Sequence, residues 1–266
     1  MCRFYKCLLF LLIGISAMGQ PRNNGNIQLF PTRIGSFFAD PNNPAFCAKS
    51  KSIRAGIRIQ DPYLLPSLAH EEWQFLVPLK KGVAQLLFSH YGNSLYRELS
   101  VSIGYALPIG ANSGIGFRMG PSRTRIGENH GKRDRWTGTI GIRARPSPRF
   151  RWEAWIKDLH ATLHRPPLRE LLHPTFAIGA AKRWPGKNSW AIHLRKELGH
   201  PLSFSSRSRI RLHERVGLIT GIKGLPLSPI LGWNWGGKSF FFRSSVSWDP
   251  PLGITPTLLL IYRYRP

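Results

Sequence analysis

The stretch LSVSIGYAL at residues 99–107 decides the fold class, because it alternates large apolar side chains with small or polar ones. Successive side chains of a β-strand point to opposite faces of the sheet, so this stretch predicts a strand with one apolar face. The same period of two recurs at 136–143 (WTGTIGIR) and at 149–156 (RFRWEAWI). The alternation therefore predicts an all-β protein.

Segments of this kind continue from about residue 52 to the C-terminal end, separated by turns rich in Gly, Pro, Asn and Ser. Strands are predicted at 52–60, 72–79, 83–91, 97–107, 113–121, 136–145, 149–157, 174–184, 188–197, 207–221, 227–235, 239–248 and 254–264. Short turns alternate with longer polar connections, such as 122–135 and 199–206, and most segments approach the roughly 9–11 residues of a membrane-crossing strand. The pattern predicts an antiparallel transmembrane β-barrel over 51–266, with about 12 or 14 strands.

Residues 1–19 resemble a secretory signal peptide, since Arg3 and Lys6 precede a short apolar run at 8–17. That run is shorter than the roughly 20 apolar residues of a membrane-spanning helix. We therefore expect a cleaved signal, export from the cytoplasm and an outer-membrane location. Residues 20–50 mix aromatic side chains with helix breakers, and we expect a coil with short helical turns, a plug-like segment near or inside the lumen.

The charge is strongly positive, because 38 Lys and Arg face 13 Asp and Glu, a formal net charge of +25. Loss of Arg3 and Lys6 with the signal leaves 36 basic residues and a charge of +23. An exported chain with no nucleic-acid module favours anionic lipid, polysaccharide or an anionic solute as counterpart, and not nucleic acid. Cys47 is the one cysteine after the predicted signal, so we expect no internal disulfide.

On several strands the cationic side chains share the face opposite to the apolar ones. If the apolar face meets lipid, these cations line an aqueous lumen, where solvation and screening lower the cost of like charges. A dry interior would not hold them, since burying an unpaired charge is very costly. The predicted basic lumen, which we expect to attract anions, consists of Arg143, Arg145, Arg149, Arg151, Arg195, Arg207, Arg209, Arg211, Arg215 and Arg243.

The sequence predicts no catalytic, cofactor-binding or metal-binding residues. His90 and Ser94 lie in a predicted hairpin turn, where nothing nearby would orient the imidazole. His160 and His164 have the spacing of a metal-ligand pair but lack a neighbouring glutamate as general base. The carboxylates show no paired arrangement for acid–base chemistry. We therefore expect a non-enzymatic protein that needs no cofactor.

Short stretches of the chain resemble a known family of barrels. They lie at 35–45 (GSFFADPNNPA), 91–98 and 103–106, 124–131, and 252–256. They resemble segments of small outer-membrane barrels of Bacteroidota related to PorV and PorQ, within the wider class of fatty-acid-transporter-like barrels. The resemblance implies an outer-membrane barrel and, for some members, a role in secretion of the type IX kind. Two features depart from the family: the basic excess, and an end on Pro266 instead of an aromatic residue.

Three functions are compatible with these observations. The first is a non-enzymatic outer-membrane channel for anionic or amphipathic solutes, surrounded by outer-membrane lipid and lipopolysaccharide. The second is an accessory or structural barrel with a protein partner in a secretion or surface-attachment apparatus. The third is a periplasmic β-sandwich that binds anionic polysaccharide. Conductance would favour the channel. A sealed lumen with a copurifying partner would favour the accessory barrel, and solubility without detergent would favour the periplasmic sandwich.

Overall fold

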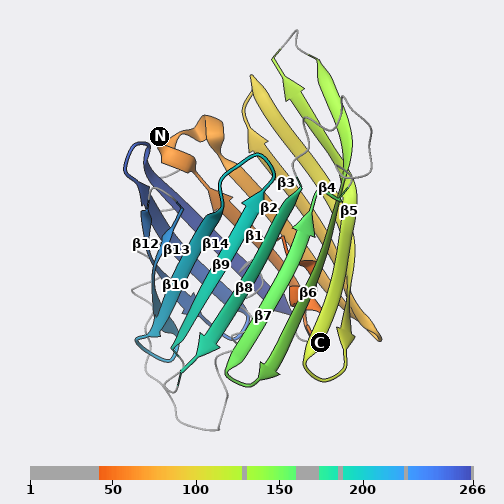
Figure 1. Cartoon of the computed structure of the whole chain (residues 1–266), viewed down its shortest axis with the longest axis vertical. Coiled ribbons are helices and arrows are strands. Elements are labelled where there is room, and N and C mark those ends of the chain that lie inside the picture. The colour runs from red at the N-terminus through yellow and green to blue at the C-terminus, as the bar shows by residue number, and fades with distance from the viewer. Residues whose placement is uncertain (1–41, 128–130, 160–173, 185–187, 225–226, 265–266) are drawn as a thin grey trace.

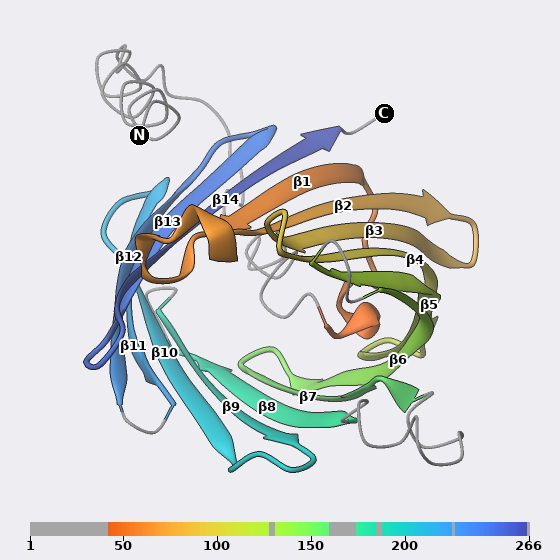
Figure 2. The same ribbon diagram turned by 90° about the horizontal axis from the view of Figure 1, so that it is seen from above.

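Within the residues that the structure describes, fourteen antiparallel strands form one sheet that closes on itself (Figures 1 and 2). The structure is a computed structural model that describes residues 42–127, 131–159, 174–184, 188–224 and 227–264. Each strand pairs with its neighbours in the chain, and β1 pairs with β14 to close the ring. Closure leaves no unpaired sheet edge, as a barrel in lipid requires. The predicted all-β barrel is confirmed.

The strand bounds agree with most of the predicted segments. The strands are β1 (Ile53–Gln60), β2 (His70–Leu79), β3 (Gly82–Gly92), β4 (Tyr96–Ile109), β5 (Ser113–Ile126), β6 (Lys132–Ser147), β7 (Phe150–Lys157), β8 (Thr175–Arg183), β9 (Ser189–Glu197), β10 (Ser203–Arg211), β11 (Val216–Lys223), β12 (Ser228–Gly236), β13 (Phe240–Asp249) and β14 (Gly253–Tyr264). The short 3-10 helices are η1 (Pro44–Cys47), η2 (Pro62–Leu64) and η3 (Pro66–Leu68). No helix in the described ranges is both long enough and apolar enough to cross a membrane.

One prediction of strand boundaries is wrong, because the segment 207–221 contains two strands. The backbone N–H groups of Leu212 and His213 both donate to the carbonyl of Val216, at 3.1 Å, and turn the chain between β10 and β11. A second prediction is wrong in extent: most of the connection expected at 122–135 is strand, since β5 runs to Ile126 and β6 begins at Lys132.

The apolar face of the strands points outward around the whole barrel. Ile103, near the middle of β4, is 64% exposed, and its outward neighbours Val101 and Leu107 are exposed as well. Phe117 on β5 and Ile140 on β6 continue this surface. In a sandwich these side chains would meet a second sheet, whereas here they lie outside one closed sheet. The alternative of a soluble β-sandwich is therefore wrong, and the exterior is of the kind that lipid covers.

The first described segment, residues 42–50, lies inside the ring. Figure 2 shows η1 within the barrel, beside β5 and β6. Asn43 holds its start, because its Oδ1 accepts from the backbone N–H of Ala45 at 3.0 Å. Its Nδ2 donates to the carbonyl of Ile142 in the wall at 3.2 Å. The predicted N-terminal segment in the lumen is thus confirmed for these residues; the predicted signal at 1–19 and residues 20–41 lie outside the described ranges.

Two glycines of β5 make the seat for η1. A Cβ atom at Gly116 would lie 2.6 Å from the backbone N of Ala45, and one at Gly114 would lie 2.7 Å from the Cβ of Ala48. Because any side chain at these positions would meet the segment, the small-residue face of β5 is shaped to hold it.

Candidate functional site

A cavity of about 280 Å³ occupies the lumen on the side formed by β1 and β6 to β14. Nine arginines and two lysines line it, and none of the described residues that line it is Asp or Glu. Of the ten arginines predicted to face the lumen, seven line this cavity. They are Arg143, Arg145, Arg149, Arg151, Arg207, Arg209 and Arg243.

The other three predicted lumen residues do not line this cavity. Arg195 forms an ion pair with Glu197 at 3.2 Å and is half exposed. Arg211 donates from Nε to the carbonyl of His213 at 3.1 Å, at the end of β10. Arg215 is exposed in the connection between β10 and β11, because the turn at 212–215 removes it from the barrel wall.

Four further cations line the cavity that the sequence prediction did not include: Arg58, Lys182, Arg183 and Lys223. Arg58 alternates with Ile57 and Ile59 on β1, so the period of two in the sequence could have predicted its luminal position. Lys223 was missed because the predicted strand ended at residue 221. It continues the inward series of Ile219 and Gly221 on β11.

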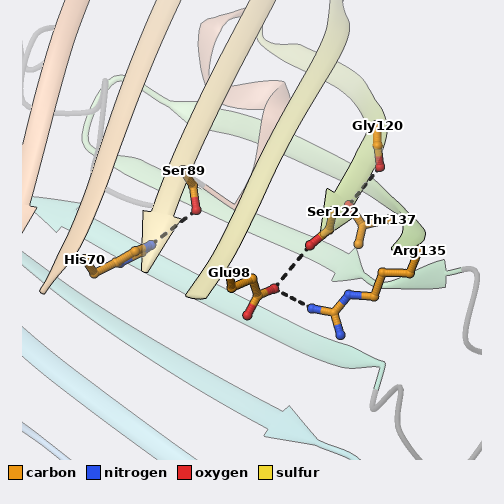
Figure 3. Close-up of polar contacts among 7 residues, drawn as sticks. All are labelled: His70, Ser89, Glu98, Gly120, Ser122, Arg135 and Thr137. Carbon is orange, nitrogen blue, oxygen red and sulfur yellow. Dashed lines mark hydrogen bonds and ion pairs between the residues drawn. The ribbon is translucent and has the colours of Figure 1, made fainter. Parts of the chain in front are cut away.

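The wall formed by β2 to β6 differs, because it carries carboxylates that pair with cations. Figure 3 shows Glu98 beside Ser122 and Arg135, and Glu98 Oε1 accepts from Ser122 Oγ at 3.3 Å and from Arg135 Nη2. Nearby, Arg58 and Glu72 form an ion pair at 2.7 Å between β1 and β2. The positive charge of the lumen is therefore concentrated on the opposite wall.

Glu153 and His193 form a polar contact on the side of the barrel that holds the cavity. Glu153 on β7 is 2% exposed, and its Oε1 lies 3.3 Å from Nδ1 of His193 on β9. Gly179 on β8 lies between them, and a Cβ there would lie 2.5 Å from Nδ1 of His193. The glycine thus lets the two side chains meet across an intervening strand.

The seated N-terminal segment touches the basic wall directly. The guanidinium groups of Arg143 and Arg151 lie over the ring of Phe46, at 5.1 and 5.0 Å from its centroid. Nη1 of Arg143 also donates to the carbonyl of Phe46 at 2.9 Å. Since both arginines line the cavity, the segment and the cavity share part of one wall.

Cys47 faces the interior of the barrel and is chemically shielded there. Its side chain is buried, and its Sγ donates to the carbonyl of Pro44 at 3.2 Å. Burial raises the pKa of the Cys47 thiol to about 12, so the group stays protonated at neutral pH. In the described ranges, no group of three His, Cys, Asp or Glu is placed to hold a metal ion.

Of the two histidine motifs considered in the sequence, only the one with His90 and Ser94 lies in the described residues. His90 lies near the end of β3, and Ser94 lies in the connection that follows. The pair His160 and His164 lies outside the described ranges.

Comparison with solved structures shows the same architecture in outer-membrane proteins. The CymD monoaromatic hydrocarbon channel is 10% identical, with a TM-score of 0.64 over 96% of this chain and 97% of its own. A Pseudomonas aeruginosa FadL homologue is 10% identical, with a TM-score of 0.60 over 89% of this chain and 95% of its own. The Pseudomonas putida toluene transporter TodX is 10% identical, with a TM-score of 0.57 over 85% of this chain and 92% of its own. At this identity the likeness shows the fold, an outer-membrane type of barrel.

No protein-family model and no curated protein sequence matches the chain. The narrower resemblance to PorV and PorQ of Bacteroidota therefore stays a prediction, as does the link to type IX secretion.

Proposed function

We propose that this protein is a non-enzymatic outer-membrane barrel that conducts anionic or amphipathic solutes through its lumen. One observation carries the proposal: a cavity lined by eleven Lys and Arg side chains and, in the described residues, by no carboxylate. A positive wall with low-dielectric surroundings concentrates anions and repels cations. Ile219, Ile230 and Leu259 line the same cavity, so an apolar group on the solute has a surface to contact.

The names of the similar proteins agree with this class of function. CymD is described as a monoaromatic hydrocarbon channel and TodX as a toluene transporter. Those names describe uncharged solutes. The arginine-lined cavity instead favours anionic or amphipathic ones here, because a guanidinium group pairs most strongly with an oxyanion.

The proposal includes the predicted location and processing. Residence in the outer membrane, against lipid and lipopolysaccharide, is supported by the outward apolar surface. The cleaved signal at 1–19 rests on the sequence, where Arg3 and Lys6 precede a short apolar run. Fractionation with carbonate extraction tests the location, because a spanning barrel stays in the membrane pellet. N-terminal sequencing of the purified protein tests the cleavage.

The channel is tested in planar lipid bilayers. Under a tenfold potassium chloride gradient, we expect the current to be carried mainly by chloride. The reversal potential should therefore have the sign of an anion-selective channel. A cation-selective current, or no current at all from heat-modifiable folded protein, would overturn the proposal.

A second candidate function is supported by the seated segment at 42–48, which occupies part of the lumen. A barrel closed by such a plug suits an accessory or structural role in a secretion or surface-attachment apparatus, as the resemblance to PorV and PorQ implies. A sealed lumen together with a stoichiometric partner that cross-links in intact cells would favour this role.

A further inference from the structure

An arginine triad formed by Arg207 and Arg209 of β10 and Arg243 of β13 lies on the basic wall of the cavity. The two strands are separated by β11 and β12, yet Arg243 lies close enough to Arg207 and Arg209 for their charges to interact. Three long side chains from two non-adjacent strands thus converge on one region of the lumen.

Glycines on the strands between them make this convergence possible. A Cβ at Gly221 of β11 would lie 3.1 Å from Cγ of Arg207, and one at Gly217 would lie 3.3 Å from Nε of Arg209. The two arginines therefore lie across the bare backbone of β11. A larger residue at either glycine would lift the guanidinium groups away from the wall.

Asn234 of β12 is an independent sign of a missing ligand. It is 0% exposed, and neither its Oδ1 nor its Nδ2 has a hydrogen-bond partner in the described structure. It stands directly opposite Arg243 on β13 and directly opposite Gly217 on β11. A Cβ at Gly217 would lie 3.1 Å from Oδ1 of Asn234 and 3.3 Å from Nε of Arg209, so the amide lies between Arg243 and Arg209. A buried amide without a partner is costly, and this one is placed where a ligand held by the triad would supply an acceptor.

The charge of the region selects the class of ligand. The cavity wall supplies no carboxylate from the described residues, and Arg207 and Arg209 are among the charged neighbours of Arg243. A monocarboxylate offers two oxygens and one negative charge to three guanidinium groups. A phosphate or sulfate group offers more oxygens and up to two charges, and matches the planar fork of arginine.

We propose that Arg207, Arg209 and Arg243, with Asn234, form a binding site for a doubly charged tetrahedral oxyanion such as phosphate or a phosphate ester. This deepens the proposed function and rests on it, since it places a solute-binding site within the proposed conduction path. Nδ2 of Asn234 donates to one oxyanion oxygen, and the guanidinium groups hold the others. Ile219 and Ile230, which line the cavity on β11 and β12, lie beside the triad and accept the apolar part of an ester.

The test is calorimetric titration of the full-length protein, folded in detergent, with inorganic phosphate, hexyl phosphate and hexanoate at pH 8. We expect saturable binding of phosphate or hexyl phosphate to one site, and binding of hexanoate at least tenfold weaker. If hexyl phosphate binds more tightly than inorganic phosphate, the ligand of the site is an amphipathic phosphate ester. If the two compounds bind with equal affinity, the ligand is the free phosphate ion. Both results support the site.

The variants Arg243→Gln and Arg209→Gln should each weaken binding at least tenfold. Arg215→Gln removes the same charge from an exposed connection and should change the affinity less than twofold. Heat-modifiable electrophoresis confirms that each variant is folded, and two triad variants keep the test valid if one of them fails to fold.

Three results would overturn the site: no saturable binding of either phosphate compound, hexanoate bound as tightly as hexyl phosphate, or equal weakening by Arg215→Gln. The reversal potential in bilayers reports the channel separately. An anion-selective current without phosphate binding refutes the site alone, whereas phosphate binding without any current refutes the channel and leaves the site standing.

Discussion

The substitution Gly116→Ala tests whether the glycine face of β5 holds the N-terminal segment in the lumen. The added methyl would lie 2.6 Å from the backbone N of Ala45 and 2.6 Å from the backbone C of Pro44, and a backbone cannot rotate away as a flexible side chain does. Forcing one extra carbon into a packed site costs about 1–3 kcal/mol. The added methyl destabilises only the seated state, in which the N-terminal segment lies against β5. When the segment leaves β5, it no longer contacts the methyl group.

The seat itself has contacts whose strength can be estimated. Three side chain to backbone hydrogen bonds hold it, from Asn43 to Ile142, from Gln85 to Pro44 and from Arg143 to Phe46. At about 1 kcal/mol each, with about 0.5–1 kcal/mol for each of the two arginines over Phe46, they contribute about 4–5 kcal/mol. The segment should therefore stay mostly seated in the variant, while its unseated population rises about 5- to 150-fold.

Cys47 reports this population through its reactivity. At pH 8, about one thiol in 10,000 is ionised while its pKa is about 12, against about one in ten at the ordinary value of 9.0. Because the Cys47 side chain is also buried in the seated state, out of reach of the reagent, alkylation proceeds through the unseated state. Mass spectrometry of the Cys47 peptide separates it from Cys2 and Cys7. We expect alkylation of Gly116→Ala to be faster than that of the unmodified chain by the same 5- to 150-fold.

The matched control is Gly138→Ala on β6, where the nearest atom to the added methyl is the Cβ of Leu159 at 3.9 Å. This control should leave the alkylation rate unchanged. If both variants are folded and their Cys47 rates equal that of the unmodified chain, the glycines do not form the seat and the reasoning is refuted.

Ile103→Arg places a charge on the outward face and should destabilise the barrel in lipid vesicles by about 2–4 kcal/mol in urea titrations, whereas Ser100→Arg on the luminal face should cost much less; equal losses would contradict the assigned faces. Burial raises the pKa of the Asp158 carboxyl above its ordinary value of 3.8, so this carboxyl lowers the free energy of unfolding once it can ionise. The loss of stability is absent below pH 3.8 and grows as the pH rises through the pKa of the folded state. Asp158→Asn should therefore raise the thermal midpoint more at pH 7 than at pH 3, and a gain of the same size at both would count against it. Glu153→Gln removes a luminal negative charge and should raise the anion-to-cation permeability ratio by up to about twofold, as read from the reversal potential, and a fall in that ratio would oppose the prediction.

The period of two predicted most of the barrel, because a strand in a barrel wall has lipid on one face and the lumen on the other. The stretch at 99–107 became the middle of β4 with its apolar residues outward. The position of the N-terminal segment was predictable in outline, since aromatic residues among helix breakers need something to cover them. Its seat was not predictable, because Gly114 and Gly116 show their role only when the segment lies against them.

The error at 207–221 has a cause that also explains the misplaced Arg215. The turn at 212–215 contains four residues, an even number, so the alternation continues through it with the same parity on both sides. Arg209 and Gly217 both point inward, so the sequence pattern predicts one strand through both of them. The same pattern places Arg215 on their face.

The arginine triad depends on that same turn. Because the chain reverses there, β11 lies beside β10, and its glycines come under the side chains of Arg207 and Arg209. A continuous strand would have spread these arginines along one line of the wall, with no bare backbone beside them. The sequence shows the cations and the glycines, but only the reversal brings them together, so the charge of the lumen was predictable from alternation and the site within it was not.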